Sequence, residues 1–203
     1  FISKFLDKKT QKINSLIKKI EKKIEYLKEQ KNVLINKYVT KGLDQNLEMK
    51  DSGVEWTGEI PKHWEVKKLK YLLDKIIDNR GRTPEYSSKG IPMLEIPNIT
   101  RGLKKPDLNF KKFVKPELVN QYERNKVSVG DVLISTVGAT SGEVVIIEDE
   151  PKFFICQNIV GLRSKKIIKS EFLYYFLKSN YFKYSLDLIN KGNTIDNLKV
   201  SVF

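Results

Sequence analysis

The first forty residues of the chain carry apolar side chains at a regular seven-residue interval. Leucine or isoleucine recurs at every seventh position from Leu6 to Leu34, and a second series, four residues later, holds Ile17 and Ile24 but also Thr10, Lys31 and Tyr38. Lysine, glutamate and glutamine fill most of the positions between. A narrow apolar seam of this kind is typical of a coiled-coil helix, whereas a globular helix has a wider stripe. The seam residues, which we expect to pair with another helix, are Leu6, Ile13, Ile17, Ile20, Ile24, Leu27 and Leu34.

Gly42 stands where this helix is expected to end. No proline or glycine precedes it, and glycine is favoured just after the last helical residue because it accepts a left-handed backbone. A helix over most of this span would be roughly 50 to 60 Å long. We therefore expect a coiled-coil spacer helix over residues 1–42 and a globular domain over residues 43–203.

Beyond Gly42 the pattern changes to short apolar runs separated by polar turns. Residues 42–61 are predicted to be a linker, residues 66–77 fit either a helix or a broken strand, and residues 79–90 are predicted to be a loop. A glycine-rich turn is expected over residues 137–142. The expected strands are Met93–Ile96, Val132–Thr136, Glu143–Ile147 and Phe153–Ile155.

Two helices are expected near the end of the chain. Ser170 can cap the first, with Glu171 in its first turn and its end at Ser179. The second runs from Tyr181 to Asn190 and is stopped by Gly192. Because strands mostly precede helices, we predict an α+β fold, in which the long N-terminal coiled-coil helix is joined to a mixed α/β globular domain.

Charge indicates the kind of partner. The chain has 38 Lys and Arg against 25 Asp and Glu, a net charge of +13, which favours a polyanion such as nucleic acid or an acidic protein surface. Residues 1–41 alone hold twelve lysines and four acidic residues. These helix lysines fit a solvent-exposed face better than direct DNA contact.

Several classes of protein are excluded by composition. No apolar run reaches the length of about 18 residues that a membrane helix needs. The single cysteine, Cys156, and the single histidine, His63, exclude a disulfide framework, a zinc finger and a multi-histidine metal site. We expect a soluble protein in a reducing, cytoplasmic setting.

The usual catalytic motifs are missing as well. Neither a GxxxxGK[ST] loop nor a GxGxxG turn occurs, and His63 lies in a loop without a nucleophile elbow. The carboxylates of Asp107 and Glu150, together with Lys152, could in principle hold Mg²⁺ and a water, but Pro151 does not fit the central strand of such a nuclease site. Cys156 is flanked by apolar residues, as an inert buried thiol would be. We therefore expect no catalysis, no cofactor and no metal.

Polar and basic loop residues offer contacts to DNA instead. Arginine and asparagine can make paired hydrogen bonds to guanine and adenine edges, and lysine, serine and threonine favour phosphates. Arg80, Arg82, Asn98 and Arg101 are the predicted base readers, although about half of all the candidates are expected to be ordinary solvated surface. The full set of candidates is Arg80, Arg82, Thr83, Asn98, Thr100, Arg101, Lys104, Lys105, Lys111, Lys112, Thr140 and Ser141.

Several segments occur in an order that is familiar. They are the lysine-rich helix FLDKKTQKINSLIKKIEKKIEYLKEQKNVLINKYVTKGL, then GVEWTGEIPKHWEVKKL, GIPMLEIPNITRG, VSVGDVLISTVGATSGEVVI, FLYYFLKS and GNTIDNLK. Together they cover essentially the whole chain. The chain resembles the DNA-specificity subunit of type I restriction-modification systems.

The resemblance implies an architecture and partners. The family has two target-recognition domains, each followed by a long helix; the two helices pack antiparallel as a spacer, and each domain reads half of a bipartite site in double-stranded DNA. Residues 5–42 resemble the helix after the first domain, and residues 55–203 the second domain. The chain thus resembles a half-length subunit or a fragment of a full one. The family subunit is not catalytic, and it bridges methyltransferase subunits and, in the full enzyme, restriction subunits.

Two other functions stay open at this point. The first is a basic coiled-coil scaffold that binds acidic proteins and no DNA, and the second is a Mg²⁺ nuclease. Because nothing in the chain covers the apolar seam, we also expect a homodimer or another helix-mediated association.

Overall fold

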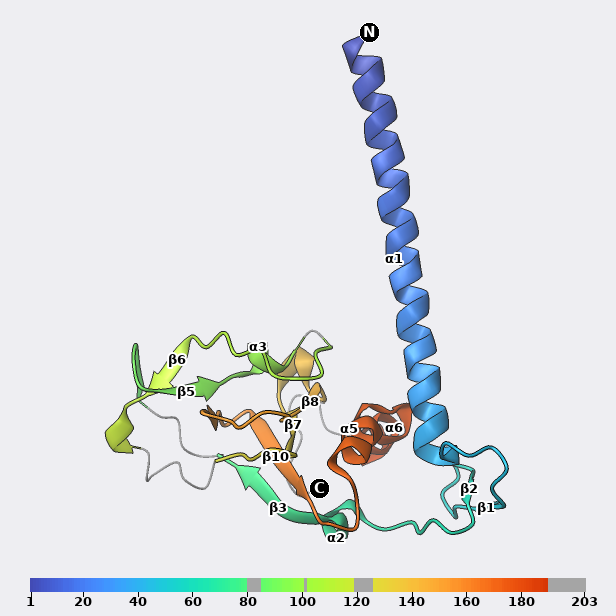
Figure 1. Ribbon diagram of the computed structural model, residues 1–203, viewed down its shortest axis with the longest axis vertical. Helices are drawn as coiled ribbons and strands as arrows, with labels where there is room; N and C mark the ends of the chain where they lie inside the picture. Colours follow the sequence, from blue (N-terminus) through green and yellow to red (C-terminus); the bar gives the residue numbers. More distant parts are fainter. Residues whose placement is uncertain (80–84, 101, 119–125, 190–203) are drawn as a thin grey trace.

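A long helix projects from a mixed α/β globule in the computed structural model, which describes residues 1–79, 85–100, 102–118 and 126–189 (Figure 1). This helix, α1 (Ile2–Lys41), has 40 residues. It ends at Gly42, whose φ of 73° is left-handed and whose N–H donates to the Tyr38 carbonyl at 3.2 Å. The predicted helix and the α+β class are confirmed.

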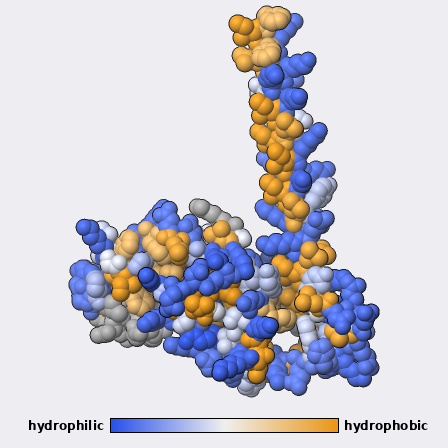
Figure 2. Space-filling model, viewed as in Figure 1, coloured by the Kyte–Doolittle hydropathy of each residue, from blue (hydrophilic) through white to orange (hydrophobic). Residues whose placement is uncertain are grey.

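Within α1, the last two turns pack on the globule. Ile35 and Val39 are 9% and 7% exposed, and α1 contacts strand β2 (Glu59–Pro61) and helices α5 (Ser170–Lys178) and α6 (Asn180–Ile189). The seven seam residues lie outside this contact and are 47 to 57% exposed. Figure 2 shows apolar side chains gathered along one side of the projecting helix. The contact that Ile35 and Val39 make with the globule was not predicted from the sequence.

Residues 42–61 were predicted to be a linker, and this was wrong. They contain an antiparallel pair of strands, β1 (Met49–Asp51) and β2, with Met49 opposite Pro61. The Lys41 ammonium donates to the Glu59 carbonyl at 2.9 Å, which ties the end of α1 to β2. Strands of three residues are too short to show a period-two pattern, so no sequence pattern revealed them.

The first of two four-stranded sheets is antiparallel, with the order β3–β10–β7–β8. Its second strand, β10, was not predicted. Gly161 in β10 pairs with Ile77 and Leu133, and a Cβ there would lie 3.2 and 3.3 Å from their side chains, so a larger residue would displace the core. Residues 66–77 form both predicted alternatives in succession, a short helix and then a strand. The elements are α2 (Leu69–Leu72), β3 (Leu73–Asp78), β10 (Ile159–Ser164), β7 (Val132–Ser135) and β8 (Val144–Ile146).

The second sheet has the order β4–β6–β5–β9, with β5 and β9 parallel. Gly90 begins the turn into β5 with φ 133°, and a Cβ there would lie 2.2 Å from the Val114 carbonyl oxygen, so glycine is required. Strands β4 and β6 were not predicted, and Ile96, expected in a strand, begins helix α3. The elements are β4 (Tyr86–Ser87), β5 (Ile91–Leu94), α3 (Ile96–Ile99), β6 (Lys112–Val114) and β9 (Phe154–Ile155), with 3₁₀ turns η1 (Pro116–Leu118) and η3 (Gly138–Thr140).

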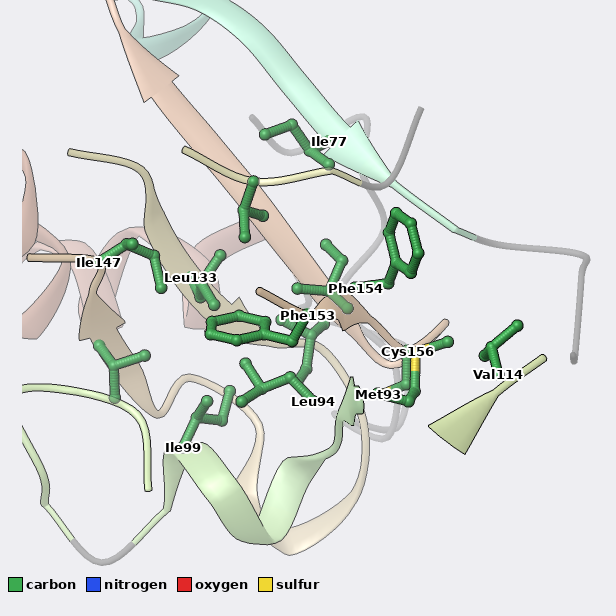
Figure 3. Close-up of a cluster of buried hydrophobic side chains, with 14 residues drawn as sticks. Ile77, Met93, Leu94, Ile99, Val114, Leu133, Ile147, Phe153, Phe154 and Cys156 are labelled. Carbon is green, nitrogen blue, oxygen red and sulfur yellow. The ribbon is translucent and has the colours of Figure 1, made fainter. Parts of the chain in front are cut away.

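The main core lies between the two sheets (Figure 3). Ile77 and Leu133 of the first sheet pack with Met93, Leu94 and Ile155 of the second, and all five are fully buried. Side chains that alternate with them along β7, β8 and β10 point to the opposite face. There they pack against α5 and α6 in a second apolar cluster.

Helices α5 and α6 lie where two helices were expected, but the predicted cap was wrong. Lys169 occupies the position before α5, and Ser170 is the first helical residue. The Ser170 hydroxyl shares a hydrogen bond with the Ser164 hydroxyl at 3.0 Å instead of capping the helix. Glu171 lies in the first turn as predicted, and Gly192 lies outside the described residues.

Candidate nucleic-acid interface

The loop between α3 and β6 carries four of the eight described DNA-contact candidates, and Asn98 of α3 holds this loop in place. The Asn98 Oδ1 accepts the N–H of Glu95 at 2.9 Å, and its Nδ2 donates to the carbonyls of Asp107 and Asn109 at 2.8 and 3.2 Å. The residue is 6% exposed. Because both amide hydrogens are used inside the protein, Asn98 shapes the loop, and we do not retain it as a base reader.

Thr100 ends α3 at the start of this loop. Its hydroxyl donates to the Pro97 carbonyl at 3.3 Å, and the residue remains partly exposed. The hydroxyl oxygen can still accept a hydrogen bond or contact a phosphate through water. Arg101, the next predicted base reader, lies outside the described residues.

Lys104 and Lys105 are tied to the acidic residues that follow β8. Glu148 pairs with both lysines, and Lys105 Nζ also lies 3.2 Å from an oxygen of Asp149. The hydrogen bonds that both lysines donate to Glu148 raise the pKa of each lysine, and they lower the pKa of Glu148. A DNA phosphate would therefore compete with the carboxylates for these two lysines. The ion pairs are exposed to solvent, which screens the attraction between their charges.

Lys111 and Lys112 differ from each other in whether a carboxylate pairs with them. Lys112 Nζ lies 2.7 Å from a carboxylate oxygen of Glu95 and 4.5 Å from the centre of the Tyr86 ring. The hydrogen bond to Glu95 raises the pKa of Lys112. Lys111 is exposed, and no carboxylate of the described ranges pairs with it. Among the four candidate lysines, Lys111 is the one most available to a phosphate.

Thr140 and Ser141 lie in the turn between β7 and β8. The Ser135 hydroxyl donates to the Thr140 carbonyl, and the Gly142 N–H donates to the Ser135 carbonyl at 2.9 Å, so β7 itself fixes the turn. The Ser141 hydroxyl oxygen is buried and has no hydrogen-bond partner within the part of the chain that the structure describes. The turn thus combines a fixed backbone with a polar atom that is not used inside the described fold.

Asn79 lies at the same end of the sheet as this turn. It follows β3 directly, and the pairing of β10 with both β3 and β7 brings it level with the end of β7, on the other side of β10. Asn79 is fully buried, donates to the Ile155 carbonyl at 3.4 Å, and leaves its Oδ1 without a partner among the described residues. Asn79 was expected in a loop, and its burial was not predicted; a polar residue directly after an apolar strand was the available signal.

Three further candidates, Arg80, Arg82 and Thr83, follow Asn79 and lie outside the described residues. The residue from which this loop begins is nevertheless described, because Asn79 follows directly on the end of β3 at Asp78. The sheet therefore brings Asn79, where this loop starts, and the η3 turn to the same end of its strands, although nearly sixty residues separate them in the sequence. The loop between α3 and β6 runs along β8, where the Ile146 N–H donates to the Lys104 carbonyl at 2.9 Å.

The residues considered for catalysis have ordinary surroundings. His63 is exposed, with its ring 6.3 Å from that of Trp64. The Cys156 thiol is buried, and burial raises its pKa, which disfavours the reactive thiolate. Within the described ranges, no three His, Cys, Asp or Glu side chains are grouped as metal ligands, and no helix there is long and apolar enough to cross a membrane.

Residues 61–203 match the protein family described as type I restriction modification DNA specificity domain. The type I restriction enzyme MjaVIII specificity subunit of Methanocaldococcus jannaschii is 31% identical over 185 residues, which cover 88% of this chain and 42% of that protein. The crystal structure of the HsdS subunit from Thermoanaerobacter tengcongensis aligns with a TM-score of 0.51 at 16% identity, over 90% of this chain and 41% of that one. The chain thus spans less than half the length of these relatives.

Proposed function

The chain belongs to the family of type I restriction-modification DNA specificity domains, and from this premise we propose that it reads one half of a bipartite DNA target for a restriction-modification enzyme. The observation that carries the proposal is the family match over residues 61–203, which include both four-stranded sheets and helices α5 and α6. The likeness of fold to the HsdS subunit supports it.

The surface that we propose for DNA consists of loops held by rigid sheets. Lys111, Lys104, Lys105 and Lys112 are assigned to phosphates, with Lys111 first because no described carboxylate neutralises it. Phosphate contacts position a protein on DNA, and base contacts specify the sequence. We assign base reading to Arg80, Arg82 and Arg101, and supporting polar contacts to Thr83, Thr100, Thr140 and Ser141.

Helix α1 is proposed as the spacer that pairs with a second helix. Its seam residues are about half exposed, and burying each such side chain stabilises an assembly by about 1.5 to 3 kcal/mol. The family resemblance favours antiparallel pairing, either with a second helix of a longer subunit or with another copy of this chain. Helix pairing fixes the distance between two recognition domains and hence between two half-sites.

Chemistry is assigned to the partner subunits. We propose that the chain itself neither methylates nor cleaves DNA, and that methyltransferase subunits, joined in the full enzyme by restriction subunits, act where this chain binds. The absence of a metal-ligand group among the described residues is consistent with this division, and so is the buried, unreactive Cys156.

A domain exchange tests the proposal. Residues 43–203 are replaced by the matching domain of a relative with a different target, in the complete complex with methyltransferase, and methylated sites are mapped. We expect one half of the methylated sequence to change and the other half to persist, whereas exchange of residues 1–34 alone should leave both halves unchanged. Unchanged methylation after the domain exchange would instead support a scaffold that does not touch DNA.

A further inference from the structure

Asn98 and Asp107 close the first part of the loop between α3 and β6. The Asp107 N–H donates to the Asn98 carbonyl at 2.7 Å, and the Asn98 Nδ2 donates in return to the Asp107 carbonyl at 2.8 Å. The residues between them, 99–106, therefore leave the fold and return to it at one point. We call this pair of hydrogen bonds the neck of the loop.

The other bonds of Asn98 fix it to α3 and to the far side of the loop. Its N–H donates to the Glu95 carbonyl and its Oδ1 accepts the Glu95 N–H, both at 2.9 Å. The Nδ2 also donates to the Asn109 carbonyl at 3.2 Å. A buried amide whose donors and acceptor are all used by the protein is held in one orientation. The neck therefore has a fixed geometry.

The backbone beyond the neck is held as well. Ile99 is fully buried and packs in the main core (Figure 3), and the Ile146 N–H of β8 donates to the Lys104 carbonyl at 2.9 Å. The side chains of Thr100, Lys104 and Lys105 stay partly or fully exposed. The loop thus directs main-chain and apolar groups into the protein and leaves these three polar side chains for a ligand.

A loop that is fixed before binding affects cognate and random DNA differently. Reading a sequence requires one geometry, because phosphate contacts set the register in which other side chains meet the bases. A loose loop must be ordered at a cost in free energy when this cognate complex forms. Random DNA is bound in many registers, so it does not demand the same order. A fixed neck should therefore favour cognate DNA over random DNA.

We propose that Asn98 is a positioning residue for sequence specificity, which touches no DNA and acts through the side chains of Thr100, Lys104 and Lys105. This inference rests on the proposed DNA-binding function and names a residue on which its selectivity depends. The residue type fits the role, because asparagine offers a donor and an acceptor on one short side chain, whereas aspartate lacks the donor and alanine lacks both.

The ratio of cognate to random binding tests the proposal in the complete complex with methyltransferase. Fluorescence anisotropy gives the affinity for a duplex that carries the mapped methylation target and for a random-sequence duplex. Asn98→Ala should weaken cognate binding by about tenfold, the size of one lost base contact, and random binding by less than about twofold. Asn109→Ala is the matched control. It removes an exposed side chain of the same type and keeps the carbonyl that accepts from Asn98, so the ratio should not change.

A purely structural role of Asn98 would give a different result. Partial unfolding removes binding-competent protein, so it would weaken the binding of both duplexes by the same factor and leave their ratio unaltered. Hydrogen exchange of the Asp107 amide reports on the neck directly in the absence of DNA. This amide should be protected in the wild-type protein and should exchange faster in Asn98→Ala.

Pro106→Gly is a second variant, which decides the matter if Asn98→Ala unfolds. It removes no hydrogen-bond donor and adds backbone freedom just inside the neck, so the ratio should fall by about two- to fivefold. An unchanged ratio in either folded variant, or an unprotected Asp107 amide in the wild-type protein, would overturn the positioning role and leave the proposed function intact. A wild-type complex that binds both duplexes equally would overturn both.

Discussion

The projecting part of α1 and the antiparallel sheet of the globule use the same apolar residue types in opposite ways. Leu27 in α1 is 54% exposed, whereas Leu133 in β7 is fully buried. The backbone of α1 is satisfied by bonds between residues four apart, so the helix needs no neighbour for its hydrogen bonds. The sheet joins strands that lie between residues 73 and 164, and each strand supplies the burial of the next. The apolar residues of the sheet therefore form the fold, and those of projecting α1 are left exposed for the helix pairing proposed above.

The largest effect should come from charging the seam. Ile17→Asp with Ile24→Asp removes two apolar contacts worth roughly 3 to 6 kcal/mol together, so the dissociation constant of the helix-mediated assembly should rise by about a hundredfold or more. Light scattering at micromolar concentration should change from an assembly to a monomer. Gln11→Asp with Ser15→Asp, which adds the same charge outside the seam, should leave the assembly intact. A wild-type chain that is already monomeric would contradict pairing between copies of this chain.

In the core, by contrast, a substitution should change the stability of the fold. Leu133→Ala should lower the free energy of unfolding by about 2 to 5 kcal/mol, because it leaves a cavity between the two sheets. Urea unfolding measures this in the monomeric double variant that carries Ile17→Asp and Ile24→Asp. In that background Leu27→Ala should change stability by less than about 0.5 kcal/mol. Equal losses at the two positions would mean that α1 is packed within the chain after all.

Loss of a polar contact in the sheet should lower the free energy of unfolding by somewhat less than the core substitution does. Arg163 binds Asp131 through two bonds of 2.8 Å, and the Asp131 side chain is 1% exposed. Arg163→Met leaves this carboxylate with the Ser128 N–H as a remaining partner, so a loss of roughly 2 to 3 kcal/mol is expected in urea unfolding. Adding Asp131→Asn should recover part of it. Lys105→Met, which breaks an exposed pair, should have no resolvable effect.

The smallest effect distinguishes cations within the proposed DNA surface. Lys111→Ala should reduce the salt slope of DNA binding by about 0.9 in the complex with methyltransferase. Lys104→Ala should reduce it by less, because Glu148 already neutralises this lysine in the free protein. Anisotropy titrations at several KCl concentrations compare the two. A larger change for Lys104 would show that the Glu148 pair opens on binding.

The two regions also differ in how far the sequence predicted them. The helix of α1, its end at Gly42 and its exposed seam follow from local spacing. β10 was missed because Gly161 interrupts its apolar run, and that glycine makes sense only once Ile77 and Leu133 are placed on either side of it. β1 and β2 were missed because three residues carry no periodicity.

The surroundings of single side chains were harder to predict than elements, for the same physical reason. Asn98 has the residue type of a base reader, but carbonyls nine and eleven positions further along the chain take its amide hydrogens. Lys104 and Lys105 look free in the sequence, and residues more than forty positions away pair with them. Availability for binding depends on such distant partners, which no local pattern reveals.

The attachment of α1 to the globule determines how far the helix can tilt at its base. The part of α1 that precedes Ile35 is about 50 Å long at roughly 1.5 Å per residue. A tilt of about 5° at its base would move the far end by about 4 Å, which exceeds the base-pair rise of about 3.4 Å. As the proposed spacer between two half-sites, α1 would have to be held to within a few degrees. Ile35, Val39 and the Asn36–Asn180 hydrogen bond are the contacts that join α1 to the globule, and their loss should then appear as tolerance of spacers one base pair too long or too short.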